Sequence, residues 1–573
     1  MALSSVVRGP FWQRIWDSKF GDLSTTGPLL WAAFLTVVVA GPWLLPGYVF
    51  GTDWPGPRRI AFPNEITSSA LLQAVLSLTG RVIGGELTGK LLVIASLFAA
   101  GALAYRAAPG HQFISGAVAA TIYVLNPFVY SRLHYGQLYL IAGYAVLPWV
   151  VVRLRILAVE PTIRTALLAA LALAVLGVLS IHLFFASALL IGALGVAYLI
   201  GAGRRAGYSK NFLPKLVLAI GASLGLSSYW IVPALTSRGY EGLKLAGIGS
   251  GDLAAFAAVP DPQLGLIPNL LGLYGFWAEA TNRFTSMKHF VPGWPAVLAV
   301  VLLLAAIGLI ANFTRKRREF APWAAALAAA AAIALVLEMG VSHPATAGLV
   351  RWLDATFPPY RGMRDAGKWA AILALAYSQL GGLGAAALLG WLRGHIVAVE
   401  RREWAASVAT ALLLAVPLYY GNGLLYGSHG EIKASPYPAG WYAADQALTK
   451  DPHPGKTLFL PWHEYMSYSF IRNENKVIAS PAPTFFSVPI VASQNPEVIG
   501  IPPPTDPEQV AVSQLVHDGP TAQWSKVLAG DGVKYILLAH DLDWSTYAYL
   551  DTQRGVMKVA DLGSITLYAV RSP

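Results

Sequence analysis

Residues 27–65 read GPLLWAAFLTVVVAGPWLLPGYVFGTDWPGPRRIAFPNE, an apolar run that opens directly into a loop rich in charges and prolines. The run is long enough to cross the ~30 Å hydrocarbon layer of a bilayer, which takes about 20 helical residues. The N-terminal region lacks the compact charged, apolar and small-residue pattern of a cleaved signal peptide, so we expect a retained first membrane helix. This stretch predicts a membrane protein whose first loop is polar.

The composition supports the same conclusion for the whole chain. Of 573 residues, 55% are hydrophobic and only 12% are charged, whereas soluble domains carry about 25% charged residues. The net charge of +11 lies in short clusters between apolar runs, which is not the pattern of a nucleic-acid-binding face. The chain has no cysteine, which excludes disulfides, thiolate zinc sites and thiol nucleophiles.

Apolar runs of roughly 16–22 residues recur along the chain and predict about eleven membrane helices. Lys and Arg gather in alternate connections, including RKRR at residues 315–318, and the positive-inside rule places those connections in the cytoplasm. We therefore predict a multi-pass plasma-membrane protein, a mainly α polytopic transmembrane helical bundle with a cytoplasmic N-terminus. The expected spans begin near Gly27, Gly89, Phe113, Leu138, Thr165, Leu183, Pro214, Trp294, Ala321, Ala370 and Trp404.

The bundle is expected to occupy residues 1–425 and to carry long outer loops at 50–88, 236–293 and 339–369. Within the first loop, residues 66–83 read ITSSALLQAVLSLTGRVI, where polar residues recur every fourth position on an otherwise apolar helix. Such a helix should lie in the membrane interface. The polar positions are Ser69, Gln73, Ser77 and Arg81.

The tail, residues 436–573, changes character and predicts an extracytoplasmic α/β domain. KTLFLPW (456–462), KVIAS (476–480), VKYILLA (533–539) and SITLYAV (564–570) have strand-like patterns. GWYAADQALTK (440–450), DPEQVAVSQLVHD (506–518) and TAQWSKVLAG (521–530) have helical patterns.

The ionisable residues that stand out gather near the expected outer face, whereas the middles of the spans contain almost none. Arg and Lys bind phosphate, and a nearby carboxylate can accept a proton from a hydroxyl. The sequence thus predicts a pocket for a phosphate whose hydrocarbon tail stays in lipid. Its candidate residues are Asp53, Arg58, Arg59, Glu65, Arg132, His134, His182, Arg361, Arg364, Asp365 and Lys368.

Each of these residues also has a structural interpretation. Arg361 and Lys368 could anchor the chain at lipid headgroups, and Arg364 could pair with Asp365. Asp53 could cap the turn DWPGP. Arg58 and Arg59 could bind surface lipid, and His134 could be an interfacial histidine. Their coincidence on one face favours the pocket.

In the tail, Trp462, His463 and Trp544 lie beside Glu464, Asp541 and Asp543 and could contact an acceptor. No metal-ligand spacing such as HExxH is present, so strand-end packing is favoured over a metal site. No Walker loop, GxGxxG or GxSxG occurs in a strand-to-helix setting, which leaves nucleotide and serine-hydrolase chemistry without support.

GTDW just after the first helix, NPFVYSRLHYGQLYLIAGYAVLPW (126–149), PPYRGMRDAGKWAA (358–371) and GDGVKYILLA (530–539) carry a resemblance to a family. With the inside N-terminus and trailing outer domain, the chain resembles the GT-C membrane glycosyltransferases. It is most similar to YfhO-type proteins and to the membrane core of actinobacterial arabinofuranosyltransferases. The resemblance implies a polyprenyl-phosphate sugar donor, an outer-face active site, and a first-loop carboxylate as base, which by position is Asp53, with Glu65 second.

We therefore expect inverting transfer of a sugar to a glycan, lipid or protein acceptor, with Asp53 as general base. Arg361, Arg364, Lys368 and Arg132 would hold the leaving phosphate, and Arg58 and Arg59 would keep Asp53 ionised. The expected partners are the donor, membrane lipids and the acceptor, without nucleic acid. No cofactor is required by this reading, although a divalent cation is compatible with it. The alternative is a non-catalytic protein that binds or translocates lipid-linked glycans. An ion-coupled transporter is disfavoured by the shortage of charge within spans.

Overall fold

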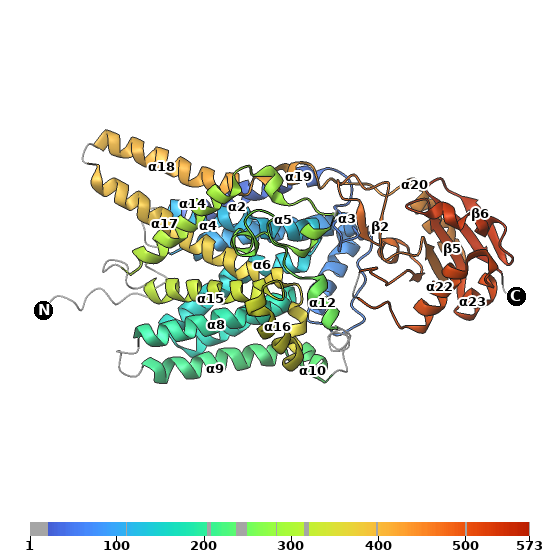
Figure 1. Ribbon diagram of the computed structural model, residues 1–573, viewed down its shortest axis with the longest axis horizontal. Helices are drawn as coiled ribbons and strands as arrows, with labels where there is room; N and C mark the ends of the chain where they lie inside the picture. Colours follow the sequence, from blue (N-terminus) through green and yellow to red (C-terminus); the bar gives the residue numbers. More distant parts are fainter. Residues whose placement is uncertain are drawn as a thin grey trace.

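The computed structural model describes residues 21–109, 112–202, 208–236, 249–281, 283–313, 320–396, 399–498 and 501–571. A helical bundle, on the left of Figure 1, adjoins a smaller domain that contains a β-sheet, on the right. This confirms the predicted fold class of a mainly helical membrane protein with a C-terminal α/β domain.

Long apolar helices build the bundle. Among the described residues, nine helices are long and apolar enough to cross a membrane, or ten if the pair α9–α10, bent by 77°, is one span. The one remaining predicted span, which was expected to begin near Thr165, corresponds to α7, a shorter apolar helix. The main helices are α2 (Gly21–Ala40), α3 (Ala70–Ala107), α4 (Phe113–Val124), α5 (Pro127–His134), α6 (Leu138–Val159), α7 (Ile163–Leu179), α8 (Ile181–Ala202), α9 (Tyr208–Leu226), α10 (Ser228–Leu235), α14 (Trp294–Ala311), α15 (Ala321–Met339), α16 (Pro344–Thr356), α17 (Ala370–His395) and α18 (Val399–Tyr420).

Helix α17 is the central element of the bundle, and it packs closely on α4 and α14. Its first two-thirds are buried almost continuously. A Cβ atom on Gly308 would overlap the carbonyl oxygen of Leu380, and one on Gly384 would overlap that of Leu304. Glycine at these two positions lets the backbones of α14 and α17 approach, as small residues do at membrane helix contacts.

The predicted interfacial helix at 66–83 is the first part of α3. Gly84, with φ +83°, breaks the helical geometry between this part and the span that follows. The polar stripe turns partly inward, since Ser77 is buried, and an apolar stripe faces outward. That exposed stripe consists of Leu71, Val75, Leu78 and Val82. An apolar face of this kind is suited to contact with lipid.

The C-terminal domain is built on a five-stranded sheet of order β4–β1–β5–β7–β6. Strand β1 (Lys456–Leu460) runs parallel to β4 (Ile490–Val491) and β5 (Val533–Ala539). Strand β7 (Ile565–Val570) runs antiparallel to β5 and to β6 (Val556–Asp561). The helices are α20 (Ala439–Lys450), α22 (Pro507–Asp518) and α23 (Trp524–Gly530). The predicted strands and helices of the tail are therefore confirmed.

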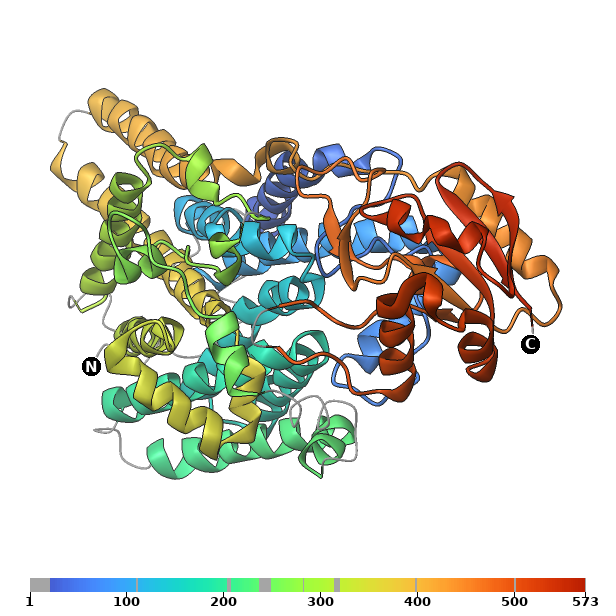
Figure 2. The ribbon, with the colours of Figure 1, turned by 45° about the vertical axis from the view of Figure 1, so that its right-hand side comes forward.

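A separate two-stranded ribbon joins this domain to the bundle. It pairs β2 (Tyr465–Ser467) with β3 (Val477–Ala479) in antiparallel register. The loop after α2 lies between this ribbon and the bundle, as Figure 2 shows for the orange strands beside the blue loop. Thr52 N donates to His134 O of the bundle at 3.3 Å, and Ala479 N donates to Thr52 O at 2.8 Å.

Several basic residues lie at the end of the bundle away from the C-terminal domain. In Figure 1, the C-terminal ends of α8 and α17 and the N-terminal ends of α9 and α18 lie on this side. The last turn of α17 contains Arg393, and the first turn of α18 contains Arg401 and Arg402. The RKRR cluster lies outside the described residues. Basic residues at this end of the bundle are the pattern on which the predicted orientation depends.

Candidate active site

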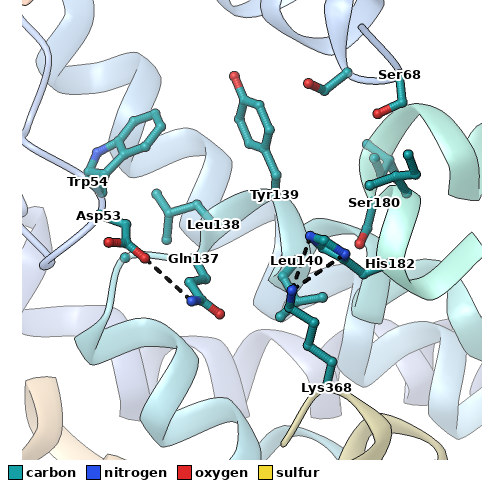
Figure 3. A pocket seen from close by; sticks show the side chains of 14 residues that line it. Asp53, Trp54, Ser68, Gln137, Leu138, Tyr139, Leu140, Ser180, His182 and Lys368 are labelled. Atoms are coloured by element: carbon teal, nitrogen blue, oxygen red, sulfur yellow. Dashed lines mark hydrogen bonds between the residues drawn. The ribbon is translucent and has the colours of Figure 1, made fainter. Parts of the chain in front are cut away.

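A cavity of about 440 Å³ lies where the first loop, the α5–α6 connection and the α7–α8 junction meet. Its lining combines two opposed polar groups with an apolar wall. Figure 3 shows Asp53 and Gln137 on one side and His182 and Lys368 on the other. The remaining lining residues are Trp54, Ser68, Ser69, Gly136, Leu138, Tyr139, Leu140, Leu179, Ser180 and Ile181.

Asp53 is held in place by three hydrogen bonds from different parts of the chain. Its backbone N–H donates to Tyr135 O at 2.7 Å. Gln137 Nε2 donates to Oδ2 at 3.3 Å, and the hydroxyl of Tyr465 donates to Oδ1 at 3.1 Å. The side chain lines the cavity and is exposed to solvent. Its position is therefore fixed while part of each oxygen remains available.

The protein atoms around Asp53 partly desolvate its carboxyl, and this desolvation raises its pKa above the ordinary value. The hydrogen bonds from Gln137 and Tyr465 oppose the shift, as does the charge of Arg132. From their proximity in sequence, Arg58 and Arg59 were expected to keep Asp53 ionised and so to lower this pKa. The structure reverses that expectation, because desolvation outweighs these opposing contributions and Arg58 is engaged elsewhere.

Behind the cavity lies a buried ion pair. Arg132 Nη1 lies 2.5 Å from Asp365 Oδ2, with 1% of the arginine side chain exposed. The same nitrogen donates to Gln137 Oε1 at 2.9 Å. This contact orients the Gln137 amide so that its Nε2 points at Asp53. The pair thus acts on the cavity through Gln137.

Lys368 supplies the cation of the opposite wall. Its Nζ lies 3.3 Å and 3.4 Å from the two ring nitrogens of His182, and it donates to Gly362 O at 3.1 Å. Lys368 forms no ion pair with any residue that the structure describes. A cation without a carboxylate partner at a cavity wall is suited to an anionic ligand.

The structure places Arg58 and Arg59 away from the cavity. Arg58 pairs with Asp445 of α20 at 2.7 Å and lies over the rings of Tyr442 and Phe485. The backbone N–H of Arg59 donates to Thr484 O. Both residues therefore attach the first loop to the C-terminal domain. This domain is distant in the sequence, so its role as their partner could not be predicted from neighbouring residues.

Arg361 and Arg364 also lie outside the cavity lining. Arg364 pairs with Asp252 at 2.6 Å and not with the adjacent Asp365, and it lies over the ring of Phe256. Arg361 Nε donates to Asp354 O at 3.3 Å. The basic segment therefore contributes one cation to the cavity, Lys368, and its arginines bind neighbouring elements.

Glu65 and His134 take no part in the cavity lining either. Glu65 is exposed in the loop before α3. The Nε2 atom of His134 lies 2.9 Å from Glu431 Oε2, and its Nδ1 lies 3.0 Å from Tyr130 O. His134 thereby joins the bundle to the chain that leads into the C-terminal domain.

The three tail candidates occupy different environments. Trp462 is buried in the core, where its indole N–H donates to Ser513 Oγ at 3.0 Å. His463 lies 2.8 Å from Glu497 and 3.4 Å from Asp543. Trp544 is 38% exposed and stacks on His540. The core position of Trp462 removes it from any surface that an acceptor could touch.

Two residues of the site were not among the predicted site residues. In the sequence, Gln137 stood out as one of the polar residues that gather near the expected outer face, in NPFVYSRLHYGQLY, and Tyr465 as one of the aromatics of the tail, in LPWHEYMSYS. Neither motif indicates a contact with Asp53. Among the residues that the structure describes, no group of three or more His, Asp or Glu side chains could hold a metal ion.

The chain was compared with known proteins. No protein-family model matches it, and no curated protein matches its sequence. Among solved structures, it is similar to the arabinofuranosyltransferase AftD from Mycobacteria, with a TM-score of 0.57 and 15% sequence identity over 96% of this chain and 40% of that chain. A variant of AftD aligns with a TM-score of 0.57 and 16% identity over 96% of this chain and 42% of the variant.

The chain thus spans less than half the length of the AftD structures. The oligosaccharyltransferase AglB from Archaeoglobus fulgidus also aligns, with a TM-score of 0.46 and 13% identity over 93% of this chain and 71% of AglB. The alignment with AftD covers both the bundle and the C-terminal domain, because it includes nearly the whole of this chain. The chain therefore shares the fold of the arabinofuranosyltransferase AftD.

Proposed function

We propose that the protein is a membrane glycosyltransferase that moves a sugar from a polyprenyl-phosphate donor to an acceptor hydroxyl. The observation that carries the proposal is the arrangement of one cavity, with a fixed carboxylate, Asp53, opposite an unpaired cation, Lys368. A base and a phosphate-binding cation on opposite walls are the two groups that such a transfer needs.

The apolar wall of the cavity supports a lipid-linked donor. Leu138, Leu140, Leu179 and Ile181 line it, and Ser68 and Ser69 mark its edge at the start of α3. The exposed apolar stripe of α3 begins at this same edge, with Leu71. A hydrocarbon tail could therefore continue from the cavity along an apolar surface into the bilayer, while its phosphate stays beside Lys368.

The proposed reaction is a single displacement. Asp53 accepts the proton of the acceptor hydroxyl, whose oxygen forms a bond to the anomeric carbon while the bond from that carbon to the phosphate oxygen breaks. The polyprenyl phosphate leaves with the electron pair, and the charge of Lys368 stabilises it. Attack from the side opposite the phosphate inverts the anomeric configuration. The raised pKa of Asp53 makes it a better proton acceptor than an ordinary aspartate.

The test is a transfer assay with purified protein and a series of polyprenyl-phosphate sugars. Asp53→Asn keeps the shape of the side chain and should abolish transfer, because general-base catalysis contributes about 10²–10⁴ in rate. Asp451→Asn is the matched control, because Asp451 accepts a tyrosine hydroxyl bond far from the cavity. The non-catalytic alternative, a binder of lipid-linked glycans, requires donor binding without transfer in the wild-type protein.

We also propose that the C-terminal domain lies outside the cytoplasm and positions the acceptor. Arg393, Arg401 and Arg402 at the opposite end of the bundle support this orientation. A protease added to spheroplasts should cleave within the C-terminal domain, and full protection of that domain would reverse the topology. The exposed ring of Trp544 and the nearby His463 form the surface on which acceptor contacts are expected.

A further inference from the structure

The ribbon β2–β3 of the C-terminal domain contacts the loop that carries Asp53. Three hydrogen bonds fix it to the first loop: Ala479 N to Thr52 O at 2.8 Å, Asn475 Nδ2 to Thr52 Oγ1 at 3.4 Å, and Asn473 Nδ2 to Phe50 O at 3.0 Å. On its other side the same loop donates to the carbonyl oxygens of His134 and Tyr135. The residue that carries the candidate base is thus clamped between the two domains.

Tyr465 is the ribbon residue that reaches the carboxylate. It begins β2 and pairs with Ala479, so the strand that holds the tyrosine is the same ribbon that binds Thr52. Its hydroxyl donates to Asp53 Oδ1 at 3.1 Å, while Gln137 donates to Oδ2 from the bundle. Each oxygen of the carboxylate therefore has one donor, and each donor comes from a different domain.

We propose that Tyr465 is a positioning residue for Asp53, and that the active site is therefore completed by the C-terminal domain. This inference rests on the proposed function. With one donor on each oxygen, the carboxylate cannot rotate, and its remaining lone pairs stay directed at the cavity where an acceptor hydroxyl would approach. The ribbon thereby couples docking of the C-terminal domain to the geometry of the base.

The hydrogen bond from Tyr465 also favours the ionised form of Asp53, because a donor to a carboxylate stabilises its charge. Other charged or titratable groups act on the same carboxylate from the elements packed around it. They are Arg132 of α5, Tyr135 of the α5–α6 connection, and Asp365 and Lys368 before α17. His182 of α8 lines the same cavity. These groups stay in place when the tyrosine hydroxyl alone is removed.

The test compares Tyr465→Phe with Tyr535→Phe in the full-length protein. Tyr535 also donates to an aspartate, Asp451, at 2.9 Å within the same domain, which makes it a matched control. Tyr465→Phe should move the acid limb of the pH profile of kcat/KM upward by about one pH unit, because the carboxylate loses a stabilising donor. It should lower kcat about tenfold with the KM for donor unchanged. Tyr535→Phe should leave both unchanged.

A pH profile of Tyr465→Phe that coincides with the wild-type profile would overturn the inference. Asn475→Ala is a second variant, which loosens the ribbon from Thr52 and leaves the tyrosine intact; it should also lower kcat at constant KM, and an unchanged kcat would count against the clamp. Full transfer by Asp53→Asn would refute the proposed function itself. Loss of transfer in Asp53→Asn together with a wild-type profile in Tyr465→Phe would refute the role of Tyr465 alone.

Discussion

The loop at residues 51–65 and the segment at residues 361–368 have similar sequences in one respect, since each concentrates charge beside an apolar helix. In the structure each sends one charged side chain into the cavity, Asp53 from the loop and Lys368 from the segment. Their arginines bind other parts of the protein: Arg58 binds Asp445, and Arg364 binds Asp252. A cluster of charges in a sequence therefore does not act as a unit, and long-range pairing decides which member is left for a ligand.

The buried pair between Arg132 and Asp365 should give the largest effect on stability. Arg132→Ala leaves Asp365 buried without its partner, and removal of one member of a buried pair costs about 3–5 kcal/mol. Thermal unfolding in detergent measures this loss. Arg364→Ala is the comparison, because Arg364 is 34% exposed and solvent screens its pair with Asp252. Equal destabilisation by the two variants would contradict the difference in burial.

The affinity for the donor should depend on Lys368 but not on the arginines near it in the sequence. Lys368→Ala removes a charge-assisted contact to phosphate, which contributes about 1.5–3 kcal/mol, or on the order of ten- to a hundredfold in affinity. Arg361→Ala should leave affinity for a polyprenyl phosphate unchanged, because Arg361 lies outside the cavity lining. Binding of a radiolabelled lipid to the purified variants measures both. A larger loss of affinity in Arg361→Ala than in Lys368→Ala would indicate that the arginines bind the phosphate.

A smaller effect is expected where the first loop meets the C-terminal domain. Arg58→Ala removes a pair whose arginine side chain is 28% exposed and whose aspartate is 6% exposed. We expect about 1–2 kcal/mol of weaker docking, less than for a fully buried pair. Hydrogen exchange should become faster in the loop and in the ribbon, and transfer should fall because Asp53 is less well held. Unchanged exchange in both segments would show that Arg58 does not contribute to docking.

Much of the fold could be predicted from the sequence, because membrane helices and strands are encoded by local patterns. The strand VKYILLA and the helix that begins near Trp294 are read from consecutive apolar residues. The two-residue β4 and the exposed edge strand β6 lack such a pattern and were not predicted. The site was predicted only in part, because its contacts are long-range: Asp53 and Tyr465 are 412 residues apart, and Arg58 and Asp445 are 387 apart.

The smallest expected effect is a dependence of stability on pH. Desolvation raises the pKa of Asp53 in the folded protein above its value in the unfolded chain. Between these two pKa values the folded state binds more protons, so stability falls as the pH rises through this window. Asparagine does not titrate. The unfolding temperature of Asp53→Asn minus that of the wild type should therefore be more positive at pH 7 than near pH 4. A difference that does not vary with pH would contradict the raised pKa.

We expect the phosphate of the donor to bind in the cavity between Asp53 and Lys368. A cryo-electron microscopy structure of the wild-type protein with a polyprenyl phosphate tests it most directly. Phosphate density is expected in contact with Lys368 Nζ beside His182, across the cavity from Asp53, with the tail leaving along the start of α3. Density at Arg361 and Arg364, with the cavity empty, would contradict it.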